Sequence, residues 1–266
     1  MKIAKLIIEN SPILPFGGHS DRLVPITKLI MVEEKTQPNG ELIEAMFKAG
    51  AHFGYSRARR HASMKPYLFG VKNGVDVIDL EKTVGMLESA KARLTELGKA
   101  GKVVLFVGTK QETRAIVEEA AKSLSMPYVS ERWVGGILTN WPEIKKRVAR
   151  LKELSDNFAK GALEKYTKKE RLLFEREMAK LQTEFGGIAA LEGSPAALVI
   201  VDPREEHIAV REAKKMKVET IALLNSDCNA KEITHPIVAN DAALLSVRYF
   251  VEALRDAYKA GAKAKA

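Results

Sequence analysis

The sequence has almost no cysteine, and it has no apolar run of the length that a membrane span requires. Cys228 is the one cysteine among 266 residues, which excludes an intrachain disulfide and a cysteine-rich zinc site. No apolar stretch reaches the roughly 20 residues that cross a bilayer. Glu9 and Asn10 interrupt the opening apolar patch before it could form the core of an export signal. We therefore expect a cytoplasmic protein without a membrane anchor.

The sequence also lacks the short motifs of common enzyme classes. It has no H-E-x-x-H, no G-x-S-x-G and neither of the glycine-rich phosphate-binding patterns. The turn at 108–110 could hold an anion at a helix N-terminus, but a single glycine is ordinary in such a turn. We therefore expect no catalysis and no cofactor. A nucleotide- or metal-dependent enzyme is the competing hypothesis, and it would need a convergent acid, base and nucleophile that the sequence does not offer.

Two acidic residues, Asp202 and Asp227, are candidates for a metal site. Asp202 and Asp227 each follow an expected strand, at the edge where α/β folds bind ligands. Together with His52 they could approach a divalent cation, although aspartate also serves in turns and helix caps. The spacing does not demand a metal, and we predict none.

Positive charge is in excess. The chain has 43 lysines and arginines against 34 acidic residues, which gives a formal charge of +9. A surplus of this size suits a polyanion such as nucleic acid, because lysine and arginine neutralise phosphates and release counterions. A merely basic surface would give the same number, so the charge alone does not decide between the two.

Short apolar segments alternate with amphipathic ones along most of the chain. Expected strands lie at 74–80, 102–108, 126–130, 196–203 and 219–225. Helices are expected between them, and a final helix is expected to begin at a cap formed by Asn240 or Asp241. This pattern predicts an α/β fold with a parallel sheet covered by helices on both faces.

The alternation is interrupted between 143 and 187. Apolar residues recur there every three or four positions on either side of a charged turn, which predicts an inserted, coiled-coil-like α-helical hairpin. We accordingly divide the chain into an α/β body at 32–142 and 188–258, the hairpin insertion, a poorly ordered extension at 1–31 and a basic tail at 259–266.

Candidate RNA-binding residues occur in three stretches. Arginines and lysines cluster at 57–72, interleaved with aromatic residues that can stack on unpaired bases. The stretch ERWVGGILTNW at 131–141 holds both tryptophans around a glycine pair, and the hairpin adds further cations. The predicted RNA-binding set is Arg57, Arg59, Arg60, Lys65, Lys72, Lys110, Arg132, Asn140, Lys145, Lys146, Arg147, Lys168 and Lys169.

Several longer stretches resemble one family. AGAHFGYSRARRHASMKPYLFGVKNGVDVIDLEKTV, FVGTKQE, PYVSERWVGGILTNW and PAALVIVDPREEHIAVREAKKM follow, in order and spacing, those of bacterial ribosomal protein two of the small subunit. The resemblance covers about 40–258. Tyr55 stands where the family usually has a second histidine, and Ala62-Ser63 stand in place of Asn-Pro. Residues 1–30 match nothing expected of the family.

The resemblance carries its own expectations. It implies a flavodoxin-like or Rossmann-like body with a helical hairpin, and a structural role in the small ribosomal subunit. It implies contact with small-subunit rRNA and with neighbouring ribosomal proteins, including the large mRNA-binding one. We expect the chain to act in the ribosome and not as a homo-oligomer.

Overall fold

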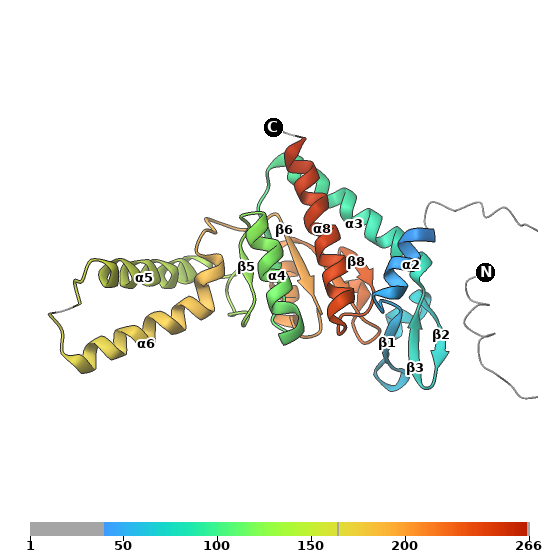
Figure 1. Cartoon of the computed structure of the whole chain (residues 1–266), viewed down its shortest axis with the longest axis horizontal. Coiled ribbons are helices and arrows are strands. Elements are labelled where there is room, and N and C mark those ends of the chain that lie inside the picture. Colours follow the sequence, from blue (N-terminus) through green and yellow to red (C-terminus); the bar gives the residue numbers. More distant parts are fainter. Residues whose placement is uncertain (1–39, 164, 265–266) are drawn as a thin grey trace, which may run out of the picture. The chain divides into compact units, whose positions relative to one another are not determined.

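A parallel sheet of five strands lies at the centre of the structure, a computed structural model that describes residues 40–163 and 165–264 (Figure 1). The strand order is β5-β4-β6-β7-β8, and every neighbouring pair is parallel. The bounds are Val104–Val107 for β4, Tyr128–Val129 for β5, Ala197–Val201 for β6, Glu219–Leu224 for β7 and His235–Val238 for β8. The predicted parallel α/β sheet is confirmed.

Helices cover both faces of this sheet. Along β4, Val104 and Phe106 contribute to the cluster formed with α3, α4 and α8, whereas Leu105 and Val107 contribute to the cluster that contains α7. Successive side chains of a strand point to opposite faces, so a strand buried on both faces must be apolar throughout. The helices span Leu80–Ala100 (α3), Gln111–Ser123 (α4), His207–Met216 (α7) and Leu244–Lys263 (α8).

A second, antiparallel sheet of three strands lies beside α2, with the order β1-β3-β2 (Figure 1). Its elements are α2 (Gly40–Lys48), β1 (Phe53–Ser56), η1 (Arg57–Arg59), η2 (Ala62–Tyr67), β2 (Leu68–Lys72) and β3 (Val75–Ile78). The expected strand at 74–80 is therefore β3, and its assignment to the parallel sheet was wrong. The reason is the tight turn at Asn73 and Gly74, whose φ angles of 52° and 77° favour a two-residue hairpin.

Two antiparallel helices fill the interruption, α5 (Trp141–Ala159) and α6 (Lys168–Phe185). Figure 1 shows them side by side and extending away from the parallel sheet. Thr167 and Glu170 form a reciprocal capping box at the start of α6, and Arg150 of α5 bonds Glu177 of α6 at 3.1 Å and 3.3 Å. The buried residues of the pair, such as Ile144 and Phe185, belong to the same hydrophobic cluster as α7. Apolar packing therefore continues from the body into the hairpin.

Two expectations at the C-terminal end differ from the structure. Helix α8 begins after Ala243, and neither Asn240 nor Asp241 caps it. The Asn240 amide donates to the carbonyl of Gly50 at 3.0 Å, so this side chain ties two distant segments together. Helix α8 then continues to Lys263, so the described part of the expected basic tail is helical. The extension at 1–31 lies outside the described residues.

Short 3₁₀ turns, η3 (Gly186–Ile188) and η4 (Ala230–Glu232), complete the structure. In the part of the chain that the structure describes, no helix is both long enough and apolar enough to cross a membrane.

Two glycines of α3 offer a matched test of how closely α3 and α8 pack. A Cβ at Gly98 would collide with the backbone of Tyr258 and Ala262, whereas a Cβ at Gly85 would meet nothing within 4 Å. We expect Gly98→Ala to destabilise the protein by about 2 kcal/mol through overpacking. Gly85→Ala, the control, should be neutral or stabilising by up to about 1 kcal/mol, because alanine favours a helix. Urea unfolding of both variants measures the difference, and equal midpoints would contradict this packing.

Candidate nucleic-acid interface

The loop that carries the first tryptophan is organised by one buried carboxylate. Glu212, on α7, is only 8% exposed and accepts hydrogen bonds from the loop at 133–139. The donors are the Trp133 indole N–H (3.2 Å), the backbone N–H groups of Gly136 (2.7 Å), Leu138 (3.0 Å) and Thr139 (3.1 Å), and the Thr139 hydroxyl (3.1 Å). These donors satisfy both oxygens of a buried charge, so the loop has one preferred conformation.

The ionisation of Glu212 depends on these bonds. Burial by itself raises the pKa of the Glu212 carboxyl, but the hydrogen bonds from Gly136, Thr139, Trp133 and Leu138 outweigh burial and lower the net pKa below its usual value. Sequence reasoning missed this residue. The available signal was a glutamate on the apolar side of α7, between the buried residues Val210 and Ala213.

The two tryptophans have different environments. Trp133 is 5% exposed and lies in the hydrophobic cluster, while the half-buried Trp141 donates from its indole to the carbonyl of Glu192 at 3.3 Å. Gly136 has a φ of 101°, which favours glycine at this turn. The loop leaves Arg132 and Asn140 exposed on its surface. Part of the stretch is therefore packing, and the predicted RNA-binding residues of the loop face solvent.

The basic segment at 57–72 divides into exposed cations and cations with acidic partners. Arg57, Lys65 and Lys72 are exposed. Arg59 lies 4.3 Å from the centre of the Tyr55 ring and pairs with Asp227 at 3.1 Å. Arg60 is half-buried and forms an ion pair through two hydrogen bonds with the fully buried carboxylate of Asp76 on β3. That guanidinium therefore ties the segment between η1 and η2 to β3.

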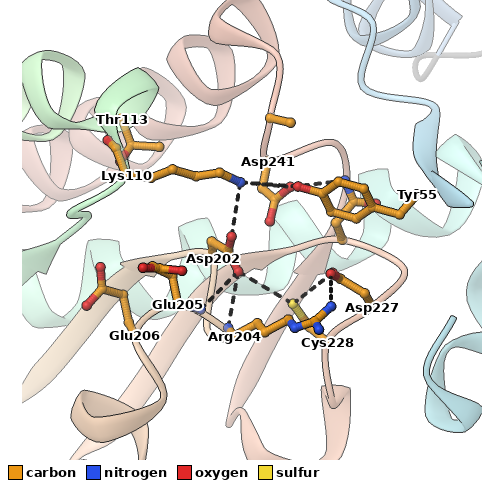
Figure 2. A network of polar contacts seen from close by, with 12 residues as sticks. Tyr55, Lys110, Thr113, Asp202, Arg204, Glu205, Glu206, Asp227, Cys228 and Asp241 are labelled. Carbon is orange, nitrogen blue, oxygen red and sulfur yellow. Dashed lines mark hydrogen bonds and ion pairs between the residues drawn. The ribbon is translucent and has the colours of Figure 1, made fainter. Parts of the chain in front are cut away.

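Lys110 follows β4 at the switch point of the parallel sheet, because β4 leads through α4 to β5 on one side while β6 lies on its other side. Its ammonium donates to Asp202 at 3.0 Å and to the Tyr55 hydroxyl at 3.2 Å, and lies 4.0 Å from Asp241 (Figure 2). Burial lowers the pKa of the Lys110 ammonium. The charges of Asp241 and Asp202 raise this pKa by more than burial lowers it, so the net pKa is above its usual value. Lys110 therefore stays charged, binds the buried Asp202 and offsets only part of the cost of burying Asp241.

The structure does not bring together the three residues that the sequence suggested for a metal, His52, Asp202 and Asp227. His52 stacks between Phe47 and Phe53, with ring centroids 4.2 Å and 4.0 Å apart, and Asp227 pairs with Arg59 and Arg204. The residues whose donor atoms do converge, within 4.8 Å of one another, are Asp202, Cys228 and Asp241. Two carboxylates and a sulfur are donors that zinc accepts. Burial raises the pKa of the Cys228 thiol well above its usual range, and we assign no ion to this cluster.

The cations of the hairpin lie at opposite ends of it. Lys145, Lys146 and Arg147 are exposed on the first turns of α5, next to the body, and Lys146 pairs with Glu143 at 2.6 Å. Lys168 and Lys169 begin α6 at the far end of the hairpin and are exposed (Figure 1). The structure therefore does not gather the predicted RNA-binding residues into one site. They stay predictions, spread over the small sheet, the turn after β4, the tryptophan loop and the hairpin.

The chain is similar to a ribosomal protein family model and to individual ribosomal proteins. The family model described as ribosomal protein S2 matches residues 46–261. The small ribosomal subunit protein uS2 of Geotalea uraniireducens is 38% identical over 223 residues, covering 84% of this chain and 87% of that protein. The protein of the same name from Chlorobaculum tepidum is 41% identical over 214 residues, covering 80% of this chain and 86% of that protein.

The role of Glu212 can be tested with an isosteric change. Glu212→Gln keeps the shape but replaces one accepting oxygen with an amide that cannot accept hydrogen bonds from the loop. We expect it to destabilise the protein by about 1–3 kcal/mol. The lowered pKa adds a pH test: the stabilisation is present above the unfolded-state pKa and is lost as pH falls through the folded-state pKa. Urea unfolding at pH 7 and pH 3 would show a smaller difference between variant and wild type at the lower pH.

Asp241 gives the opposite pH dependence. Burial, and then the charge of Asp202, raise the pKa of Asp241 to about 7. The folded state therefore binds a proton that the unfolded state has lost, so this group makes stability fall as pH rises from about 4 to about 7. Asp241→Asn should remove that slope and gain more than about 1 kcal/mol relative to wild type between pH 5 and pH 8. Urea unfolding of wild type and variant across this pH range measures the difference in stability, with a chelator present so that no metal ion binds beside Asp241. Parallel pH profiles of the two proteins would contradict the raised pKa.

Proposed function

Because the chain belongs to the ribosomal protein S2 family, we propose that it is a structural constituent of the small ribosomal subunit that binds small-subunit rRNA. The observation that carries the family assignment is the match over 46–261, which spans the parallel sheet, the hairpin and most of α8. The relatives are named as proteins of the small ribosomal subunit. Neighbouring subunit proteins, including the large mRNA-binding one, belong to the same proposal.

The exposed cations support RNA as the partner. Arg57, Lys65 and Lys72 are exposed, and none of them takes part in an ion pair with another described residue. Unpaired cations can neutralise phosphates, which supplies affinity without reading the base sequence. Arg60 and Lys110 hold buried carboxylates, so we leave both out of the proposed contact surface.

A role without catalysis is the second part of the proposal. The turn after β4 would be the natural anion site, but the Thr109 N–H and hydroxyl donate to Glu206 of the same chain at 2.8 Å and 2.5 Å. Lys110 is likewise bound to Asp202 and Tyr55. A phosphate would have to displace these partners. We infer that the polar groups of this turn stabilise the fold and do not bind a nucleotide.

Gradient sedimentation of a cell lysate that contains a tagged copy tests the proposal. We expect the tag to travel with the small subunit at low salt and to be released at high salt, because counterion release makes phosphate contacts salt-dependent. A tag that stays at the top of the gradient at both salt concentrations, beside intact ribosomes, would contradict the proposed function.

The exposed cations of the small sheet can be tested as a group. Arg57→Gln, Lys65→Gln and Lys72→Gln together should reduce the slope of log affinity against log salt by about 2–3, since each phosphate contact contributes roughly 0.7–0.9. The control variant carries Lys48→Gln, Lys82→Gln and Lys122→Gln, which change the net charge equally but remove lysines already paired with Glu44, Asp79 and Glu118. Equal slopes in the two variants would exclude these three cations as contacts.

A further inference from the structure

The C-terminal ends of α3 and α8 meet in an unusually close contact (Figure 1). A Cβ at Gly261 would collide with the carbonyl oxygen of Thr95, and a Cβ at Gly98 would collide with that of Tyr258. The Tyr258 hydroxyl also donates to the carbonyl of Lys102 at 2.9 Å, across the end of α3. Only glycine permits this approach, so the contact fixes how the side chains around it are placed relative to one another.

Lysines surround this contact. Lys99 and Lys102 lie at the end of α3, Lys259 and Lys263 lie on the last turns of α8, and all four are exposed. We call these four residues the α3/α8 patch. None of them appears in an ion pair within 40–163 and 165–264.

The nearby acidic residues do not cancel this charge. Glu96 pairs at 2.7 Å with Arg93, which also binds Glu219 at 2.7 Å and 2.8 Å, and Asp256 pairs with Arg255 at 2.9 Å. The hydrogen bond from Arg255 is the main cause of the lowered pKa of Asp256, and the charge of Lys259 contributes less. Two arginines thus bind three carboxylates, which leaves one negative charge against the four lysines, so the patch remains net positive.

Helix stability explains only part of the patch. Cations in the last turn of a helix interact favourably with its dipole, which accounts for Lys99 and Lys263. It does not account for Lys102, which follows the C-cap Gly101, or for Lys259, which lies a turn before the end of α8. Bringing four like charges together raises the energy of the free protein, and a bound polyanion would relieve that repulsion.

We propose that the α3/α8 patch is a second rRNA-binding site, which grips the phosphate backbone and is separate from the small sheet, the tryptophan loop and the hairpin. The proposal rests on the proposed function, and it adds a contact surface on helices that the predicted RNA-binding set does not include. Lysine is a flexible point charge with a strong affinity for phosphate, so the patch reads the position of the backbone and not the base sequence.

The test uses the full chain and small-subunit particles depleted of it. The patch variant carries Lys99→Gln, Lys102→Gln, Lys259→Gln and Lys263→Gln. The control carries Lys48→Gln, Lys82→Gln, Lys122→Gln and Lys231→Gln, which gives the same change in net charge. We expect the patch variant to bind with a salt slope lower by about 3 than wild type, and the control to keep the wild-type slope. Urea unfolding of both variants separates lost binding from lost stability.

Each result has a defined meaning. If wild type fails to bind the particles, both the proposed function and the patch are overturned. If wild type binds and the patch variant keeps its salt slope, only the patch is overturned, and a lowered unfolding midpoint would then assign the lysines to helix stability.

A photo-crosslinker on Ala260→Cys, between the two lysines of α8, identifies the partner directly. Cys228 is buried and should not be labelled. Crosslinks to rRNA support the proposal, whereas crosslinks only to protein would overturn it in favour of a protein contact.

Discussion

A buried carboxylate must find donors, and this requirement organises the structure around the carboxyl edge of the parallel sheet. Glu212 takes its donors from the tryptophan loop, and Glu206 takes them from the turn after β4. Asp202 is bound by Lys110, and Asp76 is bound by Arg60. The pairs at this edge join segments more than 70 residues apart, and the Arg60–Asp76 pair ties a nearby turn to β3. Removing either partner of a pair would leave an unsatisfied charge or donor in the interior. Loops that would otherwise be free are thereby held in place.

This arrangement divides the positive charge of the chain into two classes. Lys110 and Arg60 are structural, because they hold buried carboxylates at the edge of one sheet and within the other. The exposed cations of the small sheet, of the hairpin and of the α3/α8 patch are available to a partner. A formal charge of +9 counts both classes alike. The charge therefore favours a polyanionic partner without identifying the surface that would bind it.

Much of the fold could be predicted because apolar periodicity is local information. Strands β4, β6 and β7 are apolar almost throughout, since both of their faces are buried, and the seams of α5 and α6 recur every three or four residues. Strands β1, β2 and β8 were missed because they carry no such continuous apolar run: β1 and β2 are exposed or half-buried, and β8 is buried only at its last two residues. Asn240 was expected to cap a helix, but it binds the carbonyl of Gly50, nearly two hundred residues away in the chain.

The sequence by itself determined the class of the protein: a parallel α/β body interrupted by two helices, a surplus of positive charge, and motifs that resemble those of one ribosomal family. Only the tertiary structure decided which charged residues are structural and which are exposed. Arg57 and Arg60 look alike in the sequence, yet one faces solvent and the other meets Asp76 in the interior. The physical reason is that the cost of burying a charge depends on partners that only long-range folding supplies. The α3/α8 patch depends on folding in the same way, because two glycines more than 160 residues apart bring its lysines together.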